Sequence, residues 1–150
     1  MKRNNKPTFV DPTSAEGRKK YQKVLKEIIT EGVCPFCPET FKWHTKPILK
    51  RLNGWLITEN FSPYENAKFH FILVGKKHKE KISELTLTDW RTITSLISWA
   101  VKKYDIKGGG ITMRFGDSLY TGATVKHLHL HLISPEIEKG KAKTVSFPIG

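Results

Sequence analysis

Three histidines alternate with three leucines in the segment HLHLHL, residues 127–132, and make up half of the chain's six histidines. Imidazole is largely neutral at pH 7, so it can bind a metal, attack phosphorus or carry a proton there. If the segment is a β-strand, the histidines share one face and the leucines the other. An ordinary half-buried strand also alternates, but chance filling of its polar face with histidines is rare. The pattern therefore predicts a chemical site on the histidine face.

A single metal ion does not account for the whole triad. On a strand, His127 and His131 would lie about 13 Å apart at their Cα atoms, whereas zinc needs each ligand nitrogen within about 2.1 Å. The histidines must therefore divide between tasks. Cys34 and Cys37 have the C-x-x-C spacing with which two thiolates of one tight loop bind zinc, and His78 follows a predicted strand. With one triad histidine they would form a closed Cys2His2 site, the composition of a structural zinc.

The segment CPFC, residues 34–37, has a second interpretation as a thioredoxin-type redox pair. That arrangement needs a buried strand before the first cysteine and a helix that starts at it. Here a basic amphipathic helix is expected before the pair, and the residues PET follow it. We therefore favour zinc over redox chemistry.

The elements that must position these side chains are predicted from periodicity. Apolar residues recur at helical spacing before the cysteines and again in mid-chain, where the second helix should open near Thr86 or Thr88. Runs of β-branched and aromatic residues predict strands, and Asn53-Gly54 predicts a turn. Their order predicts one α+β domain over 14–150 on an antiparallel sheet, after a flexible basic arm over 1–13. The expected segments are helices over 14–31 and 82–106, and strands over 55–60, 68–75, 108–116 and 124–135.

Composition limits the class of protein. A chain of 150 residues with 38% hydrophobic residues is long enough for one soluble domain with a core. The formal net charge of +12 favours a polyanion as partner, although a solvated basic surface explains the same charge. No apolar run approaches the roughly 18 residues that span a bilayer, and no hydrophobic segment follows the basic start. We therefore expect a cytoplasmic protein without a membrane partner.

These residues resemble the histidine triad (HIT) family, whose signature is His-φ-His-φ-His-φ-φ with φ apolar. HLHLHLI, residues 127–133, matches every place of the signature, and FHFILVGKKH, residues 69–78, is similar to the family's strand that ends in a basic pair and a histidine. With CPFC, the resemblance covers about residues 34–135. It implies a HIT-like α+β fold, an antiparallel sheet of about five strands with two main helices, and a homodimer. It also implies one structural zinc per chain, no organic cofactor, and the zinc ligands Cys34, Cys37, His78 and His127.

The resemblance further implies nucleotidyl transfer on an adenine nucleotide conjugate. In the family, the middle histidine attacks the α-phosphate and forms a covalent nucleotidyl-histidine, and here it corresponds to His129. Other positions line the phosphate site or face the ribose. They correspond to His131, His70 and Thr124 for the phosphate and to Asn60 for the ribose.

Two positions depart from the family pattern. Ala123 stands where many members have a glutamine that contacts phosphate, so this contact is expected from Lys126 or from the backbone. Arg114, in the segment RFG, stands in place of a usual asparagine. Both departures bear on substrate preference. His44 has no role in any of these interpretations.

The sequence leads to three functional hypotheses. CPFC and the loop NFSPYEN resemble the bacterial diadenosine-tetraphosphate phosphorylases and hydrolases more than the phosphoramidases of the family. The leading hypothesis is therefore an enzyme that cleaves a dinucleoside polyphosphate or a similar adenylyl conjugate. The second is aprataxin-like removal of adenylate from nucleic-acid ends, with nucleic acid as the partner that the positive charge would bind. The third is a HIT protein that binds nucleotides without turnover.

Overall fold

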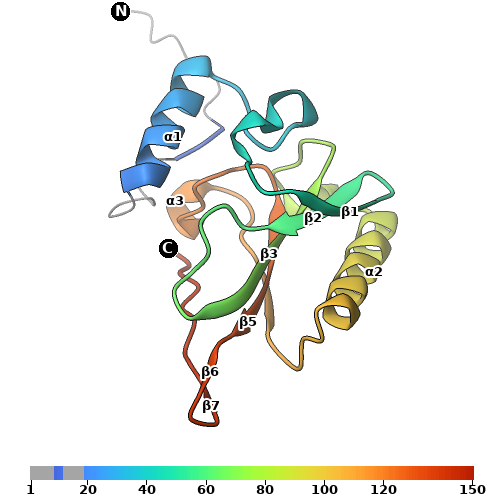
Figure 1. Cartoon of the computed structure of the whole chain (residues 1–150). Helices are drawn as coiled ribbons and strands as arrows, with labels where there is room; N and C mark the ends of the chain where they lie inside the picture. Colours follow the sequence, from blue (N-terminus) through green and yellow to red (C-terminus); the bar gives the residue numbers. More distant parts are fainter. Residues whose placement is uncertain (1–8, 12–18) are drawn as a thin grey trace, which may run out of the picture.

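A five-stranded antiparallel sheet forms the centre of the protein, and the helix α2 lies along one side of it (Figure 1). The computed structural model describes residues 9–11 and 19–150. The strand order β1-β2-β3-β5-β4 places β3 and β5 in the interior of the sheet and β4 at one edge, and a hairpin, β6-β7, follows β5. The strands are β1 (Ile48–Leu52), β2 (Trp55–Glu59), β3 (Ala67–Gly75), β4 (Gly110–Met113), β5 (His129–Pro135), β6 (Ile137–Glu138) and β7 (Lys141–Ala142). The α-helices are α1 (Lys19–Glu31), α2 (Leu87–Lys103) and α3 (Ser118–Thr121), and the 3-10 helices are η2 (Pro38–Trp43) and η3 (Ile82–Glu84).

Alternation along β3 and β5 separates histidines from the core. Pairing sets Val74 opposite His129 and Ile72 opposite His131, so both histidines share one face of the sheet. The opposite face packs against the apolar side of α2. The predicted division into a histidine face and a leucine face is therefore confirmed for His129 and His131. The core on the leucine face includes Phe71, Leu73, Leu130 and Leu132 of the sheet and Ile93, Leu96 and Ala100 of α2.

The start of helix α2 is set by a capping box between Thr86 and Asp89. The hydroxyl of Thr86 accepts a hydrogen bond from the backbone N–H of Asp89, and the Asp89 carboxylate accepts the N–H of Thr86 in return. This reciprocal capping box satisfies two backbone donors at the helix start. Of the two predicted openings, Thr86 is therefore the correct one.

A second, smaller core cluster joins α1 to the segment that precedes β5. Leu25 and Ile28 of α1 are buried with Val10 and Val125. Val10 and Val125 form an isolated β-bridge, so residues 9–11 are anchored and do not behave as the flexible arm expected there. The remainder of that arm and the expected helical residues 14–18 lie outside the described residues.

The strands differ from the prediction at two places. β1 was not expected as a strand; it forms a hairpin with β2 through the predicted Asn53-Gly54 turn, where both residues have positive φ, as a tight hairpin turn requires. β5 starts at His129 and not at residue 124, because the preceding backbone bonds elsewhere: the Leu128 N–H donates to the carbonyl of Lys79. His127 therefore lies before the strand, so its side chain does not have to point to the same face as His129 and His131.

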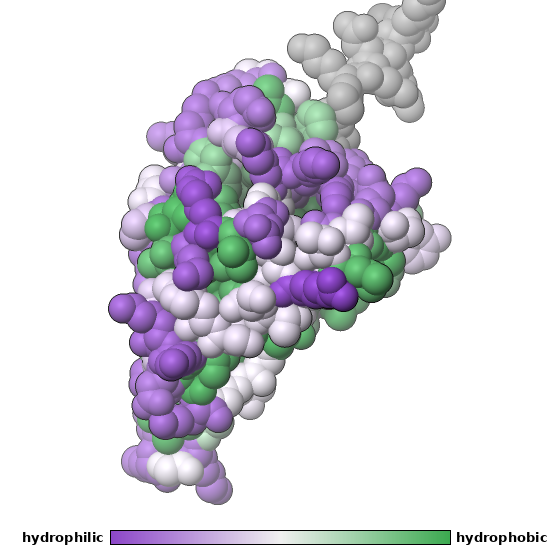
Figure 2. Space-filling model, turned by 90° about the vertical axis from the view of Figure 1, so that its right-hand side faces the viewer, coloured by the Kyte–Doolittle hydropathy of each residue, from purple (hydrophilic) through white to green (hydrophobic). Residues whose placement is uncertain are grey.

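The surface on the α2 side mixes hydrophilic and hydrophobic side chains, as Figure 2 shows. The exposed large hydrophobic residues of α2 are Leu87, Trp90 and Val101. Among the described residues, no helix is long and apolar enough to cross a membrane.

Candidate metal centre and catalytic cavity

Two cysteines and two histidines from three separate segments meet beside the start of β5. Cys34 Sγ lies 3.4 Å from His127 Nδ1, and Cys37 Sγ lies 3.6 Å from His78 Nδ1 and 3.8 Å from His127 Nδ1. All four ligand atoms lie within 4.8 Å of one another. The structure thus brings together every residue that the sequence predicted as a zinc ligand.

These separations fit a tetrahedral zinc ion. With Zn–S near 2.3 Å and Zn–N near 2.05 Å, tetrahedral angles give sulfur–nitrogen distances of about 3.6 Å. The three measured sulfur–nitrogen distances bracket this value. Four protein ligands would fill the coordination shell, so a metal held here would have no open position for substrate.

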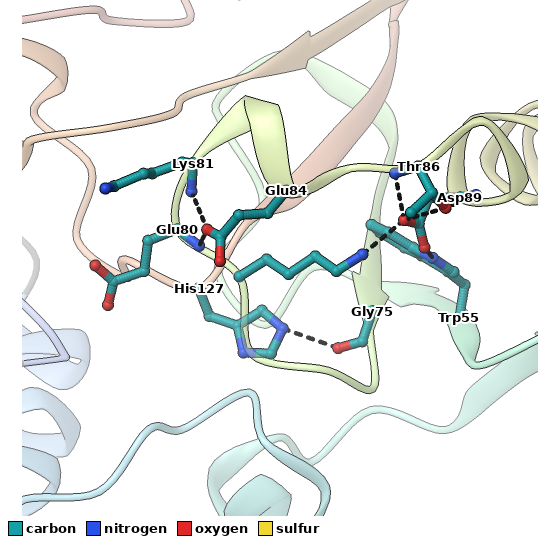
Figure 3. A network of polar contacts seen from close by, with 9 residues as sticks. Trp55, Gly75, Glu80, Lys81, Glu84, Thr86, Asp89 and His127 are labelled. Atoms are coloured by element: carbon teal, nitrogen blue, oxygen red, sulfur yellow. Dashed lines mark hydrogen bonds and ion pairs between the residues drawn. The ribbon is translucent and has the colours of Figure 1, made fainter.

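The far nitrogen of each histidine in the cluster is already oriented by a hydrogen-bond acceptor. His127 Nε2 lies 2.8 Å from the carbonyl oxygen of Gly75, and His78 Nε2 lies 3.0 Å from a carboxylate oxygen of Glu80. Since these oxygens can only accept, each Nε2 carries the proton and each Nδ1 turns its lone pair toward the sulfurs. Figure 3 shows the bond between His127 and Gly75.

A polar network stiffens the loop that carries His78. Lys79 Nζ lies 2.6 Å from the carboxylate of Asp89. The Trp55 indole N–H donates to the same carboxylate at 2.9 Å, and Trp55 and Asp89 are both labelled in Figure 3. Burial alone would raise the pKa of Asp89, but hydrogen bonds from Lys79, Thr86 and Trp55 outweigh it and hold this pKa well below its usual range. The network ties β2, the start of α2 and the residue after His78 together.

The surroundings of the cysteines do not suit a redox pair. Burial raises the pKa of the Cys34 thiol to about 12, whereas reactive thiols of redox pairs have lowered pKa values. The preceding element is the helix α1, and η2 begins only after Cys37. In this described part of the chain, no strand leads into Cys34 and no helix starts at it. The structure therefore lacks the local fold of a thioredoxin-type redox pair, and the redox interpretation is wrong.

A cavity of about 580 Å³ lies on the histidine face of the sheet. Four of the predicted substrate residues line it: Asn60, Thr124, His129 and His131. His70 is buried behind them and contacts His131. Lys126 is not a lining residue of this cavity, so the structure does not support the phosphate contact expected from its side chain.

His129 is the triad member whose tautomer suits a nucleophile. Its Nδ1 donates to the carbonyl of His127 at 2.8 Å, because a carbonyl oxygen can only accept. Nε2 therefore keeps its lone pair. Burial lowers the pKa of His129 to about 4; the bond to His127 opposes this shift, and the nearby charge of Arg114 adds to it. The ring is consequently neutral at physiological pH.

A chain of hydrogen bonds fixes the tautomers of His70 and His131. The backbone N–H of Tyr64 donates to His70 Nδ1 at 3.1 Å, so His70 carries its proton on Nε2. That nitrogen lies 2.8 Å from His131 Nδ1, which must accept, leaving a proton on His131 Nε2. Asn60 Nδ2 lies 2.9 Å from the same His70 nitrogen, but both groups are donors in this tautomer, so Asn60 does not take part in the chain. Burial, followed by the charge of His129, lowers the pKa of His70 to about 4. Burial, followed by the charges of His129, His70 and Arg114, also holds the pKa of His131 well below its usual range, so His131 can offer an N–H donor beside the cavity without being charged.

The structure adds Tyr64 and Phe147, which were not predicted for the site, and places Arg114, which was expected only to bear on substrate preference, in the cavity wall. Tyr64 stacks near His131, with ring centroids 5.9 Å apart, and Phe147 meets His131 edge-on at 5.1 Å. Arg114 also lines the cavity, and its guanidinium lies 4.0 Å from the Phe147 ring centroid. The alternation of Thr112 and Arg114 along the edge of the sheet could have indicated Arg114, but the chain after β7 has no periodic signal that points to the site. His44, by contrast, lies outside the cavity and bonds Thr58 at 2.7 Å.

Comparisons with known proteins identify the fold. No protein-family profile matches the chain, and no curated protein matches it. A HIT family hydrolase from Clostridium thermocellum has a TM-score of 0.55 with 20% identity over 72% of this chain and 94% of that chain. A zinc-bound histidine triad family protein from Mycobacterium smegmatis has a TM-score of 0.54 with 18% identity, over 77% and 83%. A diadenosine triphosphate hydrolase from Plasmodium falciparum has a TM-score of 0.50 with 17% identity, over 63% and 65%. The predicted HIT-like α+β fold is therefore confirmed.

Proposed function

We propose that the protein is a nucleotidyl hydrolase or transferase in which His129 attacks the α-phosphate of a dinucleoside polyphosphate or another adenylyl conjugate. The hydrogen bond from His129 Nδ1 to the carbonyl of His127 carries this proposal, because it leaves Nε2 unprotonated and able to attack phosphorus. The adjacent cavity, about 580 Å³, is within the usual size range of small-molecule sites. The adenine nucleotide rests on the sequence resemblance and is consistent with the similarity to a diadenosine triphosphate hydrolase.

The reaction takes two displacements at the same phosphorus. First, His129 Nε2 bonds to the α-phosphorus while the anhydride oxygen of the leaving group departs with the bonding electron pair. The nucleoside phosphate leaves as an anion, so this step needs no proton from the enzyme. Water then attacks the phosphorus, loses a proton to solvent and displaces Nε2, which releases AMP; inorganic phosphate in place of water would give ADP. Imidazole suits both steps because it is a nucleophile at neutral pH and also a good leaving group.

Three residues around His129 would hold the phosphate and the sugar. The His131 Nε2–H and the Thr124 hydroxyl would donate to the non-bridging oxygens, where negative charge is concentrated during displacement. Asn60 would face the ribose. His70 is a positioning residue, because it acts only by fixing the tautomer of His131.

The cluster of Cys34, Cys37, His78 and His127 would bind one structural zinc per chain. The sulfur–nitrogen distances and the two oriented Nε2 groups support this assignment, and the similarity to a zinc-bound histidine triad protein is consistent with it. Bound zinc would cross-link the loop after α1 to the loop after β3 and to the segment before β5. The residue pair His127 and His129 would then be fixed at the start of β5.

The proposal is tested by incubating the purified protein with diadenosine tetraphosphate, with and without inorganic phosphate, and separating the products by ion-exchange chromatography. Release of AMP in water, or of ADP with phosphate, is the expected result, and a His129→Ala variant should release neither. Equal turnover by the variant would contradict the role of His129. No turnover by the wild-type protein in either condition would contradict the substrate.

A second candidate is removal of adenylate from nucleic-acid ends, which the net charge of +12 favours. A 5′-adenylated oligonucleotide is the probe for it. Cleavage of this oligonucleotide at a higher kcat/KM than diadenosine tetraphosphate, falling steeply as salt rises, would move the assignment to nucleic acid. Binding of AMP without turnover of either substrate would instead indicate a non-enzymatic nucleotide-binding protein.

A further inference from the structure

Arg114 places a positive charge that has no ion-pair partner in the catalytic cavity. It is the only lysine or arginine among the described residues that line the cavity, although the chain as a whole is strongly basic. Within residues 9–11 and 19–150, no carboxylate forms an ion pair with Arg114. Glu65 also lines the cavity but forms no ion pair with Arg114, so the guanidinium stays available to an anion.

The position of Arg114 follows from the register of the sheet. Thr112 pairs with His131 across β4 and β5, so extending this antiparallel pairing by two residues brings Arg114 opposite His129. The ring of Phe147 packs near both groups, with its centroid 4.0 Å from the guanidinium and 5.1 Å from the His131 ring centroid. Arg114, His129 and His131 line the same cavity, so the charge lies on the wall of the space that would hold the phosphates.

The contacts of the guanidinium hold it in place but do not use all of its donors. Nε donates to the carbonyl of Pro148 at 2.8 Å, and Nη2 donates to the same oxygen. Nη1 and Nη2 each lie 3.5 Å from the Tyr64 hydroxyl, at the outer limit of a hydrogen bond. Arginine has five N–H donors, so at least one N–H of Nη1 remains for a phosphate oxygen.

From this geometry we infer that Arg114 binds the phosphate of the leaving group and selects substrates with a phosphoanhydride at the α-phosphorus. This inference rests on the proposed function and narrows its substrate class. The leaving phosphate gains negative charge as the P–O bond breaks, and a cation beside it stabilises that charge. In a phosphoramidate the leaving amine must gain a proton, which a guanidinium does not supply because it does not give up protons near neutral pH. Arg114 thus assists anhydride cleavage and leaves phosphoramidate cleavage largely unaffected.

The test compares two substrates that share an adenylyl group. The kcat/KM of Arg114→Gln is measured with diadenosine tetraphosphate and with adenosine 5′-phosphoramidate, next to Arg114→Lys and the control Lys107→Gln. Lys107 precedes β4, is exposed and is not a lining residue of the catalytic cavity, so its replacement removes one positive charge outside the site. Loss of a charged hydrogen-bond donor should lower kcat/KM for the dinucleotide by roughly 10- to 150-fold, and for the phosphoramidate by less than about threefold. Arg114→Lys should lose less than Arg114→Gln, and Lys107→Gln should change neither value.

Equal losses on both substrates would overturn the inference, because they would mean that Arg114 only holds the segment around Pro148 in place. An unchanged kcat/KM for the dinucleotide would overturn it as well. If the wild-type protein cleaves neither substrate, the proposed function fails and calorimetric binding decides the inference separately. The wild-type protein should then bind ADP about tenfold more tightly than AMP, and Arg114→Gln should remove this preference. Equal affinities in the wild-type protein, or binding of neither nucleotide, would contradict it.

Discussion

The Cys2His2 cluster and the catalytic cavity lie side by side and use neighbouring histidines in opposite ways. His127 turns Nδ1 toward the cysteine sulfurs and is almost fully buried at 1% exposed. His129 turns Nδ1 to a backbone carbonyl and keeps the lone pair of Nε2. The difference arises because β5 begins between them: His127 lies before the strand, and His129 is its first residue. Two side chains of the same type thus acquire different chemistry from the hydrogen bond that fixes each tautomer.

Replacing His129 should have the largest effect on activity. We expect His129→Ala to lower kcat by about 10³-fold or more, since the nucleophile is lost, with zinc content unchanged and only a small change in melting temperature. Rates from product chromatography and zinc by atomic absorption measure both outcomes. Loss of zinc from this variant would show that the metal cluster and the cavity depend on each other, and it would contradict the separate roles of His127 and His129.

Replacing His127, two residues away, should have the reverse primary effect. His127→Ala removes a ligand from the closed cluster, so we expect zinc content and the free energy of unfolding to fall, the latter by several kcal/mol. Treatment of the wild-type protein with a chelator should lower its melting temperature similarly and should not lower that of the variant much further. A variant that keeps its zinc and its melting temperature would contradict the metal role.

Replacing His70 tests whether a hydrogen bond that fixes a tautomer also matters within the cavity. In His70→Gln, His131 loses the partner that fixes its tautomer, so we expect kcat to fall about 10- to 100-fold. KM should change little, because His70 is buried behind the cavity. His44→Gln is the matched control, since His44 bonds Thr58 outside the cavity. Equal losses in both variants would mean that the effect is structural.

The smallest expected effect is the acid sensitivity that His70 gives to stability. Its pKa is about 4 in the folded protein because of burial, and about 6.5 in the unfolded chain. Between these values the unfolded chain binds more protons, so the stabilising contribution is present above about pH 6.5 and is lost as pH falls toward 4. The free energy of unfolding should therefore fall by about 2 kcal/mol more in the wild-type protein than in His70→Gln between about pH 7.5 and about pH 5. Parallel pH profiles for the two proteins, measured by urea unfolding, would contradict this assignment.

The two cysteines of the metal cluster could be predicted because their constraint is local, whereas the choice of His127 among the triad histidines came from the resemblance to the HIT family. The C-x-x-C spacing fixes two sulfurs in one loop, and the length of a strand excludes one ion for all three histidines. The start of β5 was harder to predict, because the backbone before it bonds residues that are far away in the sequence. The Lys126 N–H donates to the carbonyl of Phe9, and the Leu128 N–H donates to the carbonyl of Lys79. The alternation of histidines and leucines in the sequence does not show which backbone groups bond such distant residues.

The wall of the cavity was predicted less completely. Lys126 was chosen for its charge and its place beside the triad, but its backbone N–H bonds the carbonyl of Phe9 and its side chain is not a lining group. Phe147 reaches His131 only because the chain returns past the sheet after the β6-β7 hairpin, with its end near α3 in Figure 1. No periodic pattern of residues in the sequence predicts either of these two contacts. The homodimer and the cytoplasmic location stay predictions.

The central claim is that His129 forms a covalent bond to the α-phosphorus. The most direct measurement is the stereochemical course at this atom, using a dinucleoside polyphosphate made chiral there with sulfur and oxygen isotopes. Two successive displacements, first by His129 and then by water, predict retention of configuration in the released thio-AMP. Inversion would mean that water attacks the substrate directly, and it would contradict the covalent role of His129.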